Sequence, residues 1–130
     1  MARPVAVLVA VLLCCAGCGS ARADSAWRST AEDFATAVRE GDAEAACRLL
    51  STAAQDQLVA EHGSCEAGVL DSGLPSPGAV RETERFGTAA RAVLDEDTYF
   101  LGRFGTRWLV TAAGCRPVPG APFDCDLSGG

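Results

Sequence analysis

Two hydrophobic patterns follow one another along the chain after its N-terminal segment. From residue 27 to residue 70, apolar side chains recur every three or four positions, which is typical of helices buried on one side. From residue 79 to residue 112, short runs with apolar residues at alternate positions indicate strands. The intervening residues 71–78 include two prolines and two glycines, which break helices. The pattern therefore predicts a helical half followed by a sheet.

The first helix is expected to follow the sequence Ser29–Glu32, which fits a capping box. In such a box the serine accepts hydrogen bonds from first-turn amides, and the glutamate reaches back to the serine amide. Gly41 is expected to end the helix, because glycine readily adopts the left-handed conformation found at helix C-termini. The buried stripe of this helix is expected to consist of Trp27, Ala31, Phe34 and Val38.

Three shorter helices are expected to follow, over residues 42–50, 51–61 and 64–70. Each one begins at a residue whose side chain can accept a hydrogen bond from the first turn, namely Asp42, Ser51 and Ser64. Ala54 and Leu58 are expected to face inward, because they lie four positions apart on one side of their helix.

Four strands are expected in the second half, over residues 79–86, 88–94, 98–104 and 107–112. The connections between them are short, so neighbouring strands are expected to run antiparallel. The last two strands carry apolar residues on both faces and suit the centre of the sheet, whereas the charged first strand suits an edge. The expected fold is therefore α+β, with N-terminal helices packed on a curved four-stranded antiparallel sheet.

The first 17 residues have the layout of an export signal. Arg3 precedes the apolar run Val5–Leu13, which leads to small residues. That run is too short to cross a membrane, since a transmembrane helix needs about 20 apolar residues. The string Cys15-Ala16-Gly17-Cys18 resembles a bacterial lipobox, with Cys15 standing where the pattern prefers leucine. The resemblance implies cleavage before Cys18 and a diacylglyceryl group on its thiol.

This interpretation divides the chain into a lipoprotein signal peptide (residues 1–17), a tether (18–26) and a single domain (27–130) that ends in a proline-rich loop. It places the protein on the outer side of the cell membrane, held in the lipid bilayer through Cys18. Ordinary signal-peptide cleavage near Ala21 or Ala23 is the alternative, and it would release a soluble secreted protein.

Four of the seven cysteines lie beyond the export segment. An even number in an exported domain indicates two disulfides and an oxidising compartment. The favoured pairs are Cys47 with Cys65, which a hairpin of helices can bring together, and Cys115 with Cys125, which flank the proline-rich loop. A zinc site is the competing interpretation, but one histidine and the lack of a Cys-x-x-Cys spacing among these four argue against it.

The net charge of −6 and the absence of lysine argue against a nucleic-acid partner, because binding to phosphates depends on clustered basic residues. Ten acidic residues lie between residues 24 and 71, where the only basic residues are three arginines. We therefore expect an acidic surface on the helical half of the domain. Its simplest role is solubility.

Few residues offer catalytic chemistry. His62, the single histidine, is expected at a helix C-terminus, and the nearest approach to an acid pair is Asp97 with Tyr99. The sequence contains neither a Gly-x-Ser-x-Gly elbow nor a glycine-rich phosphate loop. We therefore expect no enzymatic activity, no cofactor and no metal. The aromatic residues that could either fill the core or line a ligand cavity are Trp27, Trp108 and Phe123.

Three strings carry a resemblance to a known family: residues 41–47 (GDAEAAC), 97–101 (DTYFL) and 108–117 (WLVTAAGCRP). They are similar to small actinobacterial lipoproteins, whose architecture resembles the nuclear-transport-factor-like (SnoaL-like) cone of helices over a curved sheet. The resemblance implies a fold and a location but no reaction, because one fold can host many functions.

The expected function is that of a membrane-anchored extracytoplasmic lipoprotein, a non-enzymatic binding or accessory module. Its expected partners are the lipid bilayer, through Cys18, and a membrane protein or a small apolar ligand. Two alternatives remain open. One is a cone-fold enzyme of the isomerase or hydrolase kind that uses Asp97, Tyr99 or His62, and the other is a soluble secreted structural protein.

Overall fold

The computed structural model describes residues 25–129. The signal peptide, the lipid attachment at Cys18 and nearly all of the tether lie outside the described residues. Within the described part of the chain, no helix is both long enough and apolar enough to cross a membrane.

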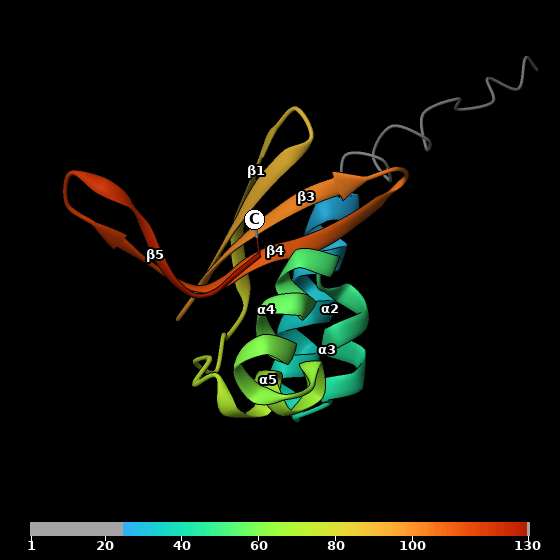
Figure 1. The fold of residues 1–130 in the computed structure, drawn as a ribbon. Coiled ribbons are helices and arrows are strands. Elements are labelled where there is room, and N and C mark those ends of the chain that lie inside the picture. The colour runs from blue at the N-terminus through green and yellow to red at the C-terminus, as the bar shows by residue number, and fades with distance from the viewer. Residues whose placement is uncertain (1–24, 130) are drawn as a thin grey trace, which may run out of the picture.

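The fold is α+β, as expected, with a layer of helices against an open antiparallel sheet (Figure 1). The helices are α2 (Ala26–Glu40), α3 (Ala43–Leu49), α4 (Thr52–His62) and α5 (Cys65–Asp71). The strands are β1 (Val80–Phe86), β2 (Ala89–Leu94), β3 (Thr98–Phe104), β4 (Arg107–Val118) and β5 (Ala121–Ser128). They follow one another across the sheet in the order β1-β2-β3-β4-β5, and the helices lie on one face (Figure 1).

The prediction of four strands was wrong, because the expected proline-rich loop, residues 116–124, forms the end of β4, a tight turn and the first half of a fifth strand, β5. These two strands pair as a hairpin in which Arg116 lies opposite Asp124. Pro122 is tolerated because β5 is an edge strand, and Pro117 lies where the register of β4 and β5 shifts between Arg116 and Val118. The turn itself uses Pro119 and Gly120, and the positive φ of 71° at Gly120 suits glycine.

The expected start of the first helix was also wrong. Helix α2 begins at Ala26, and the amide of Ser29 donates to the carbonyl oxygen of Ser25 (2.9 Å), so Ser29 lies within the first turn. The earlier start brings Trp27 into contact with Trp108 of β4, with ring centres 5.6 Å apart. The burial of Trp27 therefore extends the helix beyond its local capping signal.

The other helix starts and the end at Gly41 are confirmed. Gly41 has a φ of 68° at the end of α2. The next three helices each have a side chain that accepts a hydrogen bond from the amide three residues later; these residues are Asp42, Ser51 and Ser64. Such contacts satisfy donors that a helix leaves without an internal partner, and they depend only on neighbouring residues.

Helix α2 packs directly on the sheet and supplies the centre of the core. The ring of Phe34 meets the ring of Tyr99 edge to face, with centres 5.1 Å apart, and both residues are fully buried. The hydroxyl of Thr30 donates to the carbonyl oxygen of Trp108 (3.3 Å). Because side chains alternate between the two faces of a strand, Phe100 points to the face opposite Tyr99, away from α2. The expected edge position of the charged first strand is confirmed.

Two disulfides join segments of the described chain, and they are the pairs that the spacing favours. Cys47–Cys65 connects α3 to α5, with 6.1 Å between the Cα atoms. Cys115–Cys125 connects residues that lie directly opposite each other in β4 and β5. Gly68 allows α5 to approach α4, since a Cβ at this position would lie 2.6 Å from the Cβ of Leu58.

Replacement of both Cys47 and Cys65 with alanine is expected to lower the free energy of unfolding by about 3 kcal/mol, because the disulfide restricts the unfolded chain. Urea denaturation of the oxidised protein measures the loss. The matched control replaces Cys115 and Cys125, whose sequence separation is 10 rather than 18, so its loss should be slightly smaller. Four free thiols in the native exported protein, detected by alkylation and mass spectrometry, would contradict the pairing.

Candidate functional site

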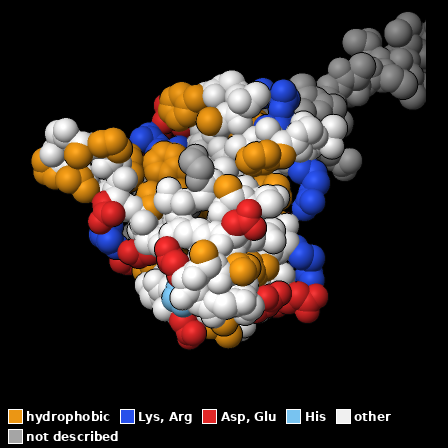
Figure 2. Space-filling model, viewed as in Figure 1, with side chains coloured by type: hydrophobic (Ala, Val, Ile, Leu, Met, Phe, Trp, Pro, Cys, Tyr) orange, Lys and Arg blue, Asp and Glu red, His pale blue; other side chains and the backbone are white. Residues whose placement is uncertain are grey.

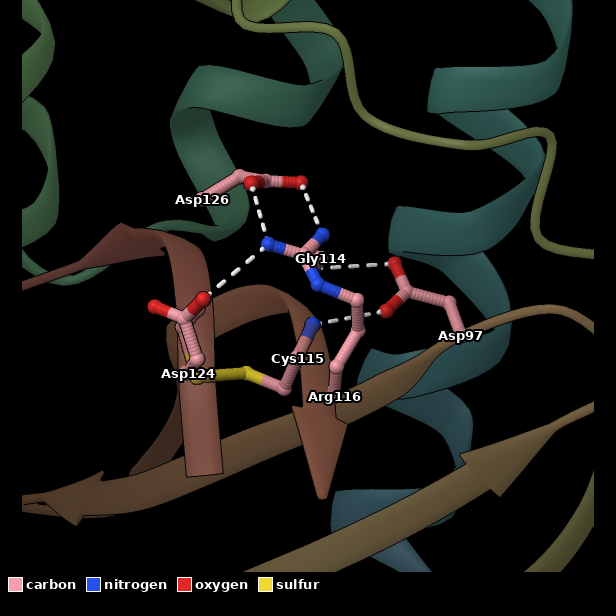
Figure 3. A network of polar contacts seen from close by, with 7 residues as sticks. Asp97, Gly114, Cys115, Arg116, Asp124 and Asp126 are labelled. Carbon is pink, nitrogen blue, oxygen red and sulfur yellow. Dashed lines mark hydrogen bonds and ion pairs between the residues drawn. A yellow bond between two sulfur atoms is a disulfide. The ribbon is translucent and has the colours of Figure 1, made fainter. Parts of the chain in front are cut away.

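The carboxylate of Asp97 connects the start of β3 to the middle of β4 (Figure 3). Its Oδ1 accepts from the amides of Thr98 (2.7 Å) and Cys115 (3.0 Å), and its Oδ2 accepts from the amide of Gly114 (3.0 Å). The residue is only 8% exposed. Three N–H donors therefore satisfy a buried charge, and the same charge holds β4 in place.

Gly114 makes this arrangement possible. Its φ is 65°, a conformation that residues with a Cβ rarely adopt. A Cβ added at this position would also lie 2.6 Å from the carboxylate of Asp126 on β5. Both the backbone conformation and the close approach of Asp126 therefore require glycine at the point where the β4 amides donate to Asp97.

An ion-pair cluster lies next to this contact on the exposed side of the hairpin (Figure 3). The guanidinium of Arg116 donates to Asp126 (3.2 Å) and to Asp124 (3.3 Å), and both acids help to raise the pKa of Arg116. Burial raises the pKa of Asp97 above its ordinary value, and the negative charge of Asp126 acts in the same direction. The three amide donors oppose this shift only partly.

The three catalytic candidates do not share a cavity. Asp97 and Tyr99 both lie on or beside β3, and both are buried. Burial, followed by the charge of Asp97, raises the pKa of Tyr99, so its hydroxyl stays protonated; within residues 25–129 that hydroxyl has no hydrogen-bond partner. His62 ends α4, where its Nε2 lies 3.8 Å from a carboxylate oxygen of Glu61. Three hollows on the described surface are lined by other residues.

An apolar hollow of about 370 Å³ lies on the face of the sheet that the helices leave open. Its largest side chains are Phe100 of β3 and Phe123 of β5, whose rings meet edge to face with centres 5.1 Å apart. Thr111 and Ser128 also belong to its lining. This hollow can hold a small apolar group.

The fold separates the three aromatic residues that the sequence suggested as the possible lining of one ligand cavity. Trp27 and Trp108 pack against each other in the core on the helical side, whereas Phe123 pairs with Phe100 on the open side. The contribution of Phe100 was missed because its partner strand, β5, was expected to be a loop. Among the described residues, no group of three or more His, Cys, Asp or Glu side chains is placed to hold a metal ion.

Comparison of the chain with protein-family models, with curated proteins and with solved structures gives no match. The resemblance to actinobacterial lipoproteins with a nuclear-transport-factor-like cone therefore stays a prediction.

Replacement of Asp97 with alanine is expected to lower the free energy of unfolding by about 3 kcal/mol, because it leaves backbone donors buried without an acceptor. Asp97→Asn should recover part of the loss, since its amide oxygen still accepts while its NH₂ group faces a donor. Urea denaturation measures both variants. The control is Asp124→Asn, whose side chain is 66% exposed and should be nearly neutral. Equal stability of Asp97→Ala and this control would contradict the structural role of Asp97.

Proposed function

We propose that this protein is a membrane-anchored extracytoplasmic lipoprotein that acts as a non-enzymatic binding or accessory module. The observation that carries the proposal is the string Ala16-Gly17-Cys18 directly after an apolar run of export length. The two disulfides support it, because disulfides persist in oxidising compartments outside the cytoplasm. Cleavage before Cys18 would place the lipid at the new N-terminus of the chain.

The length of the tether limits how far the folded domain can lie from the bilayer. Eight residues from Cys18 to Ser25 precede α2, and a fully extended chain of that length spans at most about 30 Å. A domain held at this distance suits a protein that meets its ligand or partner at the membrane surface. The α+β layout is compatible with the nuclear-transport-factor-like cone, which we retain as part of the proposal.

The apolar hollow beside Phe100 and Phe123 supports a binding role. Its volume of about 370 Å³ lies within the range of small-molecule sites, and its lining is largely apolar. Asp97 and Tyr99 are buried away from this hollow, and the Asp97 carboxylate is committed to backbone amides. That arrangement supports binding of a small apolar ligand over acid–base catalysis by these residues.

Replacement of Cys18 with alanine is expected to abolish labelling by radioactive or alkyne-tagged fatty acid and to block processing at residue 18. The wild-type protein and Cys18→Ala are each produced in intact cells, which are then fractionated and analysed by immunoblotting. Cys14→Ala is the matched control, since it changes a cysteine of the same segment outside the attachment position. Unchanged fatty-acid labelling of Cys18→Ala would contradict the lipid anchor. A soluble product cleaved near Ala21 or Ala23 would instead favour the secreted protein.

The hydrophobic dye N-phenyl-1-naphthylamine is expected to fluoresce more strongly when it binds the hollow beside Phe100. Phe123→Ser should weaken its binding by about tenfold, because it removes one of the two rings that line the site. Phe104→Ser is the control, since Phe104 is 51% exposed and lies outside this hollow. If a fluorescence titration gives the same dye affinity for Phe123→Ser and Phe104→Ser, the dye does not bind in this hollow.

A further inference from the structure

The sequence Arg-Phe-Gly-Thr occurs twice, at residues 85–88 and 103–106. Each copy occupies the turn of a hairpin, the first between β1 and β2 and the second between β3 and β4. The glycines adopt the same conformation, with φ values of 63° and 64°. The amide of Arg103 donates to the carbonyl oxygen of Thr88 (2.8 Å), so the two turns lie side by side. We call this pair of segments the twin turns.

The twin turns carry two arginines whose side chains have no carboxylate partner among the described residues; the Nε of Arg85 donates instead to the carbonyl oxygen of Gly87 (2.8 Å). Five arginines of the described chain form ion pairs with carboxylates: Arg28, Arg48, Arg81, Arg91 and Arg116. Within residues 25–129 no ion pair involves Arg85, Arg103 or the adjacent Arg107. The guanidinium of Arg85 lies over Trp27 and Trp108, at 5.5 and 5.8 Å from the ring centres. A surplus of positive charge therefore gathers at this end of the domain.

A hollow of about 290 Å³ lies between these arginines. Its lining includes Arg85, Arg103, Trp108 and Ala26, the first residue of α2. The N-terminus of this 15-residue helix carries a partial positive charge and adds to the field of the two guanidinium groups. A phosphate group is the ligand chemistry that this combination favours, because arginine donates to phosphate oxygens in a planar fork.

Two exposed aromatic side chains lie next to these arginines in the sequence and project from the other face of their strands, outside the lining of the hollow. Phe86 and Phe104 are 57% and 51% exposed, and each one follows the arginine of its turn in the sequence. Two exposed phenylalanines beside basic residues suit the boundary between lipid headgroups and acyl chains, where apolar rings enter and cations meet phosphate. A free anion in solution would explain the arginines but would leave the exposed rings without a role.

The opposite end of the domain carries the acidic charge. Figure 1 shows α5 at the end of the molecule away from the start of α2, and Figure 2 shows acidic side chains at that lower end. The exposed acids of α3, α4 and α5 are Glu44, Asp56, Glu61, Glu66 and Asp71. Although the full chain carries a net charge of −6, the domain can therefore approach an anionic surface with its basic end.

We propose that the twin turns dock on the bilayer itself, with Arg85 and Arg103 bound to the phosphates of anionic phospholipids and Phe86 and Phe104 inserted between the headgroups. The proposal rests in part on the lipid anchor, since a tether from Cys18 would keep the start of α2 within about 30 Å of the membrane. Docking fixes the orientation of the domain, so that the acidic helical end points away from the membrane.

The two tryptophans of the chain provide a built-in probe, because both lie at the docking end, 5.6 Å apart. The mature lipidated protein, which begins at Cys18, is reconstituted in vesicles that contain brominated phosphatidylcholine, with or without phosphatidylglycerol. Bromine quenches tryptophan fluorescence only at close range. We expect quenching with phosphatidylglycerol, much less quenching without it, and loss of the difference at high salt.

Arg103→Gln is expected to lower the ratio of docked to undocked protein by about fivefold, the usual effect of one basic residue near an anionic membrane. Arg103→Lys should retain most of the docking, and Phe104→Ser should reduce it without changing the net charge. Arg39→Gln is the matched control, because Arg39 has no carboxylate partner among residues 25–129, donates only to the hydroxyl of Thr36 and lies about 20 Å along α2 from Ala26. Leu70→Ser is the corresponding apolar control, because Leu70 is 61% exposed and lies on α5 at the opposite end of the domain. Circular dichroism verifies that each variant is folded.

The readouts separate docking from the lipid anchor. Co-sedimentation with vesicles measures anchoring, whereas quenching measures docking of the domain. Wild-type protein that sediments with vesicles but shows no effect of phosphatidylglycerol on quenching would overturn docking and leave the anchor intact. Equal quenching of Arg103→Gln and Arg39→Gln would also overturn it.

Relief of quenching by millimolar inorganic phosphate, at an ionic strength matched with chloride, would assign the hollow to a soluble anion and reject the membrane. If Cys18 is not lipidated, binding to phosphatidylglycerol vesicles that Arg103→Gln weakens would still support docking.

Discussion

The packing of α2 across one face of the sheet is the interaction on which the rest of the structure depends. Phe34 of α2 contacts Tyr99 of β3, and Trp27 of α2 contacts Trp108 of β4. These contacts bury apolar side chains of both the helix and the sheet. Burial of large aromatic side chains is among the strongest contributions to stability in a domain of this size. Because the helices cover a single face, the other face stays open, and its apolar residues become available for binding.

The sheet itself is extended by contacts between distant residues. The β4–β5 hairpin is joined by the Cys115–Cys125 disulfide, and the buried carboxylate of Asp97 holds β4 from the side of β3. Gly114 permits that contact because it has no Cβ to meet Asp126. The hairpin in turn brings Phe123 beside Phe100 and so completes the apolar hollow. A buried charge with a structural role therefore supports the proposed ligand site indirectly.

The start of α2 also determines how the domain would meet a membrane. It lies beside the twin turns, so the chain leaves the fold at the end that carries Arg85, Arg103 and the two exposed phenylalanines. Tether, basic charge and exposed rings thus occur at one end, whereas the open apolar hollow lies on the sheet. Anchoring and ligand binding would then use different surfaces, and neither would block the other.

The sequence alone determined the features that depend on neighbouring residues. The caps at Asp42, Ser51 and Ser64 and the α+β order of elements follow from short-range hydrogen bonding and from hydrophobic period. Tertiary structure decided the features that depend on residues far apart in the chain. Contact with Trp108 moved the start of α2, and pairing with β4 turned a proline-rich segment into β5. The repeated Arg-Phe-Gly-Thr turns became one surface only because the antiparallel sheet places alternate hairpin turns at the same end.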